Sequence, residues 1–115
     1  MQSAAASPPE EGAGMLVWFS VTPIGTGSAS VSAEVARALE AVEATGIRAV
    51  TDASGTLLEG DWEACMAALR VAGEAVLASA PRVSFTCKFD LRNDDKPDQT
   101  GEDKLASLAA ARRGR

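Results

Sequence analysis

The sequence contains no histidine and no tyrosine, and it has only two cysteines, Cys65 and Cys87, among 115 residues. Without histidine the chain lacks the commonest general base, the commonest zinc ligand and the Ser–His and Cys–His forms of nucleophilic catalysis. Two cysteines alone cannot complete a metal site. The composition therefore argues against an enzyme, and we expect no metal and no cofactor. Two buried thiols would suit a protein of the reducing cytoplasm.

Long apolar runs and an excess of positive charge are missing as well. No segment reaches the length that spans a membrane, so we expect no membrane partner. The net charge is −5, which argues against a nucleic-acid groove because such a groove needs clustered lysine and arginine. Acidity fits a small or cationic ligand, although mild acidity also serves solubility.

The first fourteen residues, MQSAAASPPEEGAG, consist mainly of small residues, two prolines and two glutamates. This composition is typical of a disordered leader, and it has neither the basic start nor the apolar run of a secretory signal. We expect a single domain at 15–112, followed by a flexible C-terminus at 113–115.

Apolar periodicity predicts the order of strands and helices. Residues 15–22 alternate as a strand that ends at Pro23, and a helix follows from an N-cap at Ser30 to a terminating Gly46. The other expected elements are strands at 47–52 and 56–59, a helix from its N-cap Asp61 to Ala80, a strand at 82–90 and a short helix at 102–112.

The order βαββαβ predicts a ferredoxin-like α+β fold. Its four-stranded antiparallel sheet has the strand order 4-1-3-2, and right-handed crossovers place both helices on one face. A short C-terminal helix follows. The buried stripe of the second helix is expected to consist of Trp62, Met66, Leu69, Gly73, Val76 and Leu77.

The face of the sheet that the helices leave open carries Leu16 and Trp18. Such an apolar patch is usually covered, and we expect a second copy of the chain to cover it. The alternative is that Trp18 packs under the C-terminal helix of its own chain. The polar end of this face carries Ser20, Thr22, Lys88 and Asp90, and it includes Glu59 if Leu58 points into the core.

A recess that is half apolar and half polar, at a subunit boundary, is typical of a small-molecule site. A solvated sheet end with salt bridges fits the same pattern. The loop GTGSAS at 25–30 lacks the lysine of a Walker loop and the third glycine of a dinucleotide fingerprint. Its glycines are therefore interpreted as a tight turn between strand and helix.

Three spaced blocks resemble the thiamine-binding protein family. They are MLVWFSVTPIGTG at 15–27 with SVS at 30–32, GTLLEGDWE at 55–63 and DDKPDQTGEDK at 94–104. The resemblance covers about residues 15–110, although Trp18 is bulkier than the small or polar residue typical of that position. It implies a ferredoxin-like protomer, a homodimer or homotetramer, and binding of thiamine or its hydroxymethylpyrimidine moiety without catalysis.

The chemistry of thiamine selects candidate side chains. Glu59 or Asp90 can accept from the pyrimidine amino group, and Asp52, Asp90 or Trp18 can face the cationic thiazolium. The full set of candidate ligand-binding residues is Ser20, Thr22, Thr26, Asp52, Thr56, Glu59, Lys88 and Asp90.

Structural roles suit Thr26 and Thr56 equally well, as a turn cap and a sheet hydroxyl pair. Two other functions stay open. One is a structural or regulatory module whose open face docks a protein partner, and the other is an enzyme that uses Glu59, Asp90 and Lys88 as acid and base.

Overall fold

A computed structural model describes residues 14–93 and 99–114 of the chain. The predicted leader, except Gly14, and Arg115 therefore lie outside the described residues. The predicted order of elements is confirmed. The elements are β1 (Met15–Ile24), α1 (Ser32–Ala44), β2 (Arg48–Thr51), β3 (Thr56–Gly60), α2 (Trp62–Leu77), β4 (Arg82–Leu91) and α3 (Gly101–Arg113).

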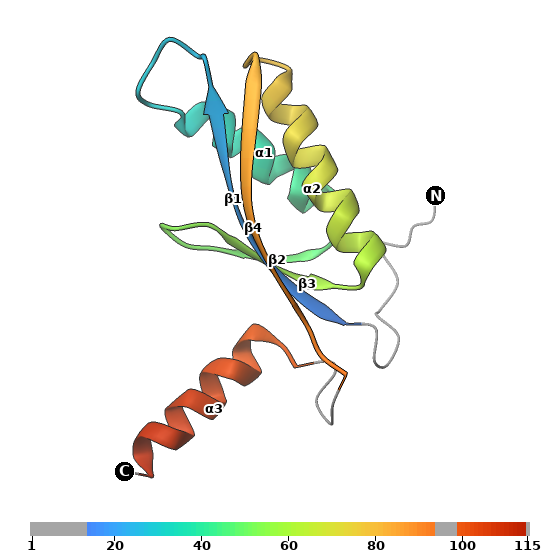
Figure 1. Cartoon of the computed structure of the whole chain (residues 1–115), viewed down its shortest axis with the longest axis vertical. Coiled ribbons are helices and arrows are strands. Elements are labelled where there is room, and N and C mark those ends of the chain that lie inside the picture. Colours follow the sequence, from blue (N-terminus) through green and yellow to red (C-terminus); the bar gives the residue numbers. More distant parts are fainter. Residues whose placement is uncertain (1–13, 94–98, 115) are drawn as a thin grey trace.

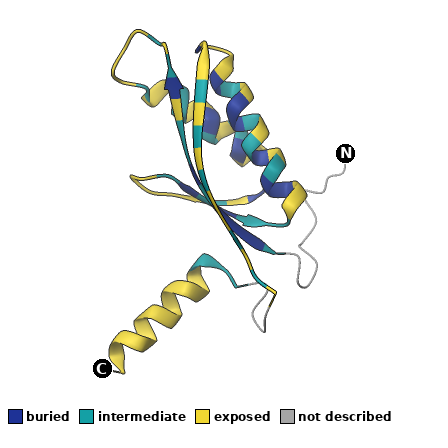
Figure 2. Cartoon of the chain, in the orientation of Figure 1, coloured by how far each residue is buried: buried dark blue, intermediate teal, exposed yellow. Residues whose placement is uncertain are grey.

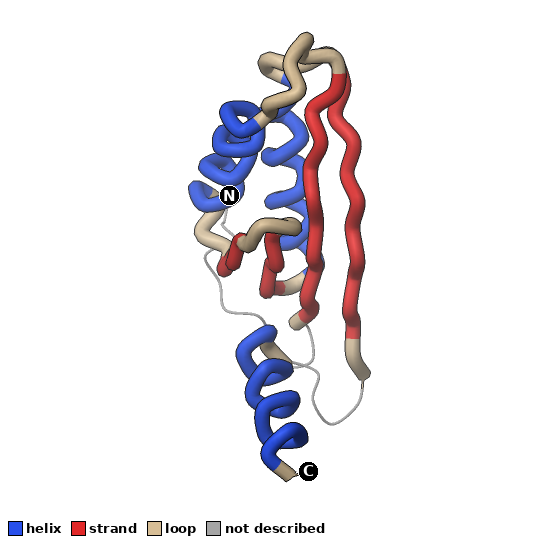
Figure 3. The backbone as a smooth tube through the Cα atoms, turned by 90° about the vertical axis from the view of Figure 1, so that its left-hand side faces the viewer, coloured by secondary structure: helices blue, strands red, loops and turns tan. Residues whose placement is uncertain are grey.

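The four strands form one antiparallel sheet in the order β2-β3-β1-β4, which is the predicted order read from the other edge. The fold class is therefore ferredoxin-like. α1 and α2 cover one face of the sheet, as Figure 3 shows, and the other face is left without a helix along most of its length (Figures 1 and 3). α3 lies beyond one end of the sheet, past the last residues of β4.

The core lies between the sheet and the two helices (Figure 2). Val17, Phe19 and Leu58 point to this side and are at most 1% exposed, as is Val42 of α1. The predicted stripe of α2 is only partly right, because Trp62 and Leu77 lie about half exposed. The residues that α2 buries are Ala64, Cys65, Ala68, Ala72, Gly73 and Val76. α2 packs against both α1 and the sheet, and small side chains allow this close approach.

Local signals at the ends of elements have mixed outcomes. β1 continues through Pro23 to Ile24. Beyond Phe19 this strand pairs only with β4, so it has a free side on which a missing N–H is tolerated. Ser30 is not the N-cap of α1, whose first turn has no side-chain cap. Gly46 ends α1 at φ +84°, as predicted. Asp61 caps α2 by accepting from the Ala64 N–H at 2.8 Å.

α3 begins with a capping box, in which the Thr100 hydroxyl and the Asp103 carboxylate each accept a backbone N–H of the other residue. None of its residues is buried. Leu105 and Leu108 are 66% and 55% exposed, so the apolar side predicted for this helix contacts solvent in the single chain. Within residues 14–93 and 99–114, no helix combines the length and apolarity needed to cross a membrane.

Candidate functional site

The open face of the sheet and the first turns of α3 enclose a cavity of about 530 Å³. We call it the open-face recess. Its lining residues come from all four strands, from the β2–β3 turn and from α3: Leu16, Trp18, Arg48, Val50, Asp52, Gly55, Leu57, Glu59, Lys88, Asp90, Gly101, Glu102, Lys104 and Leu105.

The floor of the open-face recess is apolar. Strand register places Val50 beside Leu57, and Leu57 beside Trp18, across three neighbouring strands. The Trp18 ring lies against Gly55, where a Cβ atom would be 2.7 Å from ring carbons. Leu16 is only 6% exposed, so one chain already covers it and the sequence-based argument for a second copy is weaker at this residue.

Glu59 is the most enclosed carboxylate of the open-face recess, with 10% of its side chain exposed. The Arg48 guanidinium lies 3.3 Å from one of its oxygens, and the Gly101 N–H donates to the other at 3.1 Å. Arg48 also pairs with Glu102 at 2.9 Å. These contacts attach the start of α3 to the sheet, and they resolve the orientation of Glu59: Leu58 is fully buried and Glu59 lies on the open face.

Asp90 lies on β4 at the other side of the floor, opposite Leu16 in the register. Its carboxylate accepts from the Lys104 ammonium of α3. That hydrogen bond is the largest cause that lowers the pKa of Asp90 below its ordinary value, with smaller contributions from the charges of Lys104, Arg92 and Lys88. Asp90 is therefore ionised at neutral pH. Lys88 lies next to Trp18 across the strand pair.

Asp52 lines the open-face recess at the β2–β3 turn, but its carboxylate is already used there. It accepts from the Ser54 N–H and hydroxyl at 2.8 Å and from the Gly55 N–H at 3.2 Å. The bond from the Ser54 backbone is the largest cause that lowers its pKa. These hydrogen bonds stabilise the turn, and all three are accepted by Oδ1 of Asp52. A ligand in the open-face recess would therefore bind to the other carboxylate oxygen.

Four of the eight predicted site residues do not line the open-face recess. Ser20 and Thr22 follow Trp18 on the same face of β1 but lie farther along the strand. Thr26 lies in the loop after β1, where its hydroxyl donates to Ser28 O. Thr56 pairs with Phe19, lies on the helix-covered face at 2% exposure and shares a 2.9 Å hydroxyl pair with Thr51.

Sequence reasoning missed the contributions of Arg48 and of α3. Arg48 is opposite Glu59 in the β2–β3 register, and fixing the parity of Glu59 would have placed both on the open face. The Thr100–Asp103 pair has the S/T-x-x-D/E spacing of a capping box, so the start of α3 was readable. The contact of this helix start with Glu59 could not be read from the sequence, because it depends on a close approach between distant parts of the chain. A Cβ atom at Gly101 would lie only 2.7 Å from the Leu57 side chain, and only the fold reveals that approach.

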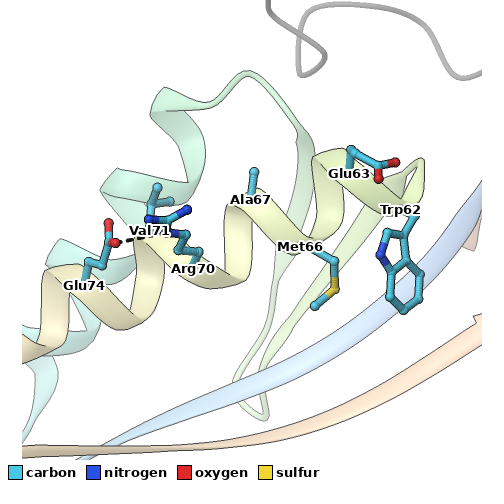
Figure 4. A pocket seen from close by; sticks show the side chains of 7 residues that line it. All are labelled: Trp62, Glu63, Met66, Ala67, Arg70, Val71 and Glu74. Carbon is cyan, nitrogen blue, oxygen red and sulfur yellow. Dashed lines mark hydrogen bonds and ion pairs between the residues drawn. The ribbon is translucent and has the colours of Figure 1, made fainter. Parts of the chain in front are cut away.

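A second cavity, of about 520 Å³, lies along the outer side of α2. Figure 4 shows Trp62 and Met66 pointing toward the ribbons of β1 and β4, while Glu63 and Ala67 point away from them. Its polar groups include Arg70 and Glu74, which pair with each other at 3.1 Å. None of the predicted ligand-binding residues lines it.

The open-face recess combines an aromatic and aliphatic floor with charged groups of both signs. No cluster of three histidine, cysteine or acidic residues suited to a metal exists among the described residues. Burial raises the pKa of the Cys65 thiol to about 11, so this cysteine is no nucleophile at neutral pH. The fold and the recess define a ferredoxin-like domain with the features of a small-molecule binding site.

The comparison with known families agrees with this class. The family model described as "Thiamine-binding protein" matches residues 17–109, and the chain belongs to this family. Among curated relatives, a UPF0045 protein of Mycobacterium bovis is 47% identical over 68% of this chain and 76% of its own length. One from Methanothermobacter thermautotrophicus is 42% identical over 78% and 91% of the two chains. The family description names binding and no reaction.

Solved structures show the same fold. A hypothetical protein from Methanocaldococcus jannaschii superimposes with a TM-score of 0.76 at 33% identity, covering 84% of this chain and 97% of that one. A Thermotoga maritima protein, whose name assigns it provisionally to thiamine biosynthesis or salvage, gives a TM-score of 0.70 at 20% identity. It covers 83% of this chain and 98% of its own, and at that identity it supports the fold alone.

Proposed function

We propose that this chain binds thiamine, or its hydroxymethylpyrimidine moiety, in the open-face recess and catalyses no reaction on it. One observation carries the proposal. A single recess of about 530 Å³ joins a floor that contains Trp18 to two carboxylates, Glu59 and Asp90. This volume lies in the range of small-molecule sites, and membership in the thiamine-binding family supports the choice of ligand.

The aminopyrimidine ring would lie on the floor beside Trp18, Leu57 and Val50. Glu59 would accept from its amino group, at the cost of loosening the contact with Arg48. Asp90 would face the thiazolium, because its lowered pKa keeps it anionic and a cation is the partner it already holds in Lys104. A charge-assisted hydrogen bond contributes roughly 1.5–3 kcal/mol, so two such contacts and ring stacking give affinity between the millimolar and the low micromolar range.

Assembly and location belong to the same proposal. Val50 is 50% exposed on the same floor as the half-buried Trp18. A second copy placed over the open face would close the open-face recess, giving a homodimer or a homotetramer. We place the protein in the cytoplasm, since both cysteines are free thiols and such thiols persist in a reducing compartment.

Tryptophan fluorescence tests the site directly, because the chain has only two tryptophans. The Trp62→Phe variant leaves Trp18 as the single reporter, and thiamine should quench its emission in a saturable manner. The matched control, Trp18→Phe, keeps only Trp62 on α2 and should not respond. Calorimetric titrations with thiamine, its phosphates and hydroxymethylpyrimidine would then identify the preferred form.

A saturable response from Trp62 with none from Trp18 would move the site to the second cavity and contradict the proposal. The absence of both quenching and binding heat at millimolar thiamine, with the protein folded and its assembly intact, would overturn it. The docking module without a small ligand would then be favoured. Turnover of thiamine into products would instead contradict the non-enzymatic part.

A further inference from the structure

Two neighbouring rows of side chains cross the open face of the sheet and line the open-face recess. Strand register gives the first, which we call the charged row, as Arg48, Glu59, Leu16 and Asp90. It gives the second, the Trp18 row, as Val50, Leu57, Trp18 and Lys88. Lys88 is therefore the charged end of a row that is otherwise apolar.

The start of α3 already holds the charged row. The charged side chains of this row have these partners: the Gly101 N–H for Glu59, Glu102 for Arg48 and Lys104 for Asp90. Lys88 differs from them. It is exposed, it lines the open-face recess, and it makes no hydrogen bond or ion pair in the part of the chain that the structure describes. The open-face recess therefore contains an ammonium group that is available to a ligand.

The two ends of the open-face recess differ in charge. At the β4 end, the Lys104 hydrogen bond is the largest cause of the lowered pKa of Asp90, and the charges of Arg92 and Lys88 lower it further. Three cations therefore surround one carboxylate there. The lining at the other end, from β2, β3 and the first turn of α3, has one cation and three carboxylates: Arg48, Asp52, Glu59 and Glu102. The β4 end is thus the favourable place for an anionic group of a ligand.

We propose that the open-face recess prefers the phosphate ester of thiamine to thiamine itself, and that Lys88 pairs with the phosphate. The inference rests on the proposed function, in which Asp90 faces the thiazolium. In the ester a short hydroxyethyl arm joins the phosphate to that ring, so the phosphate must lie close to Asp90. Lys88 precedes Asp90 by two residues on the same face of β4, about 7 Å along the strand. An ammonium group at this place binds a phosphate as a point charge.

The phosphate also offsets a repulsion that thiamine alone would meet. Asp90 is held by Lys104, so it does not fully neutralise Lys88. A cationic thiazolium beside Asp90 would be repelled by that ammonium group, since like charges a few ångström apart interact unfavourably. A phosphate on the same ligand places a negative charge between the two cations and turns the repulsion into attraction.

Titration calorimetry with thiamine and thiamine monophosphate tests the preference. We expect the wild type to bind the monophosphate about fivefold to tenfold more tightly, because the pair is charge-assisted but exposed. Lys88→Met should abolish the preference, Lys88→Arg should keep it, and Lys88→Glu should reverse it. The matched control Arg82→Met removes an exposed charge from the same face of β4, about 20 Å away, and should retain the preference.

The comparison of the two ligands on the wild type needs no variant, and circular dichroism establishes that each variant is folded. Equal affinity of the wild type for both ligands would overturn the role of Lys88 and leave the proposed function intact. Binding of neither ligand would overturn both. A preference for the monophosphate that persists in Lys88→Met would overturn the inference too, because the phosphate would then bind elsewhere.

Discussion

At the scale of single residues, Glu59 combines the strongest constraints in the open-face recess. It is nearly enclosed, paired with Arg48 and bonded to the Gly101 N–H. Glu59→Gln keeps the shape but removes the charge, so thiamine should bind about tenfold more weakly, since charge-assisted hydrogen bonds are about twice as strong as neutral ones. Titration calorimetry measures the effect, and Glu43→Gln on the exposed side of α1 is the control. Unaltered affinity would remove Glu59 from the site.

Gly55 has a structural role that its sequence context does not reveal. A Cβ at this position would lie 2.5 Å from the Phe19 carbonyl oxygen and 2.7 Å from the Trp18 ring. The backbone oxygen cannot move aside cheaply, so Gly55→Ala should destabilise the fold by about 1–3 kcal/mol. Urea unfolding measures this. Gly114→Ala, where the nearest atom is 3.6 Å away, should be nearly neutral. Equal stability of the two variants would contradict this close packing.

The alternation of side chains between the two faces of the sheet explains which site residues were predictable. Alternation along β1 correctly placed Leu16 and Trp18 on the open face, because one long strand has many residues that agree. β3 is only five residues long, so its two faces were not distinguishable from pattern alone. Burial decides the matter: Leu58 is buried, which puts Glu59 in the open-face recess and Thr56 on the opposite face.

At the scale of elements, the order and type of every strand and helix were predictable, and some of their boundaries and buried faces were not. The period change from two to 3.6 is a strong signal over ten residues or more. The buried face of α2 was misjudged because large apolar residues suggested a stripe through Trp62 and Leu77, whereas a helix packed on two sides buries its alanines. Such contacts arise from tertiary packing, which no local pattern contains.

The first turns of α3 attach it to the sheet, and Lys104 supplies one of these attachments through Asp90. In Lys104→Met the pKa of Asp90 should rise toward its ordinary value of 3.8, because its largest stabilising partner is lost. NMR titration of the Asp90 carboxyl measures this. Since the folded-state pKa is lowered, the contribution of the pair to stability is present above pH 3.8 and is lost as the pH falls through the lowered value.

The same variant should bind thiamine a few times more tightly, because the cationic ligand no longer competes with an ammonium group for Asp90. Arg112→Met, in the last turn of α3, is the control for a lost positive charge on the same helix. An Asp90 pKa that is equal in Lys104→Met and wild type would contradict the contact itself. Weaker thiamine binding would instead mean that Lys104 holds the ligand and does not exclude it.

At the scale of the whole molecule, charge distinguishes recognition of the cationic thiazolium of thiamine from recognition of its aminopyrimidine. The chain carries −5, and the lining of the open-face recess contributes four acidic and three basic residues, hence −1. Thiamine carries a permanent positive charge on its thiazolium, whereas hydroxymethylpyrimidine at neutral pH carries none. Recognition through the aminopyrimidine alone would treat both ligands alike, and recognition of the cation by Asp90 would not.

Salt distinguishes these cases, since mobile ions screen partly exposed charges over about 10 Å or less at and above 0.1 M. Thiamine affinity should fall severalfold between low and high salt, while hydroxymethylpyrimidine affinity should stay nearly constant. Titration calorimetry of both ligands in the same buffers provides the measurement, and Asp90→Asn should remove most of the difference. Parallel salt curves for the two ligands would show that the acidic lining does not contact the thiazolium. Binding would then depend on the Trp18 floor and Glu59 alone.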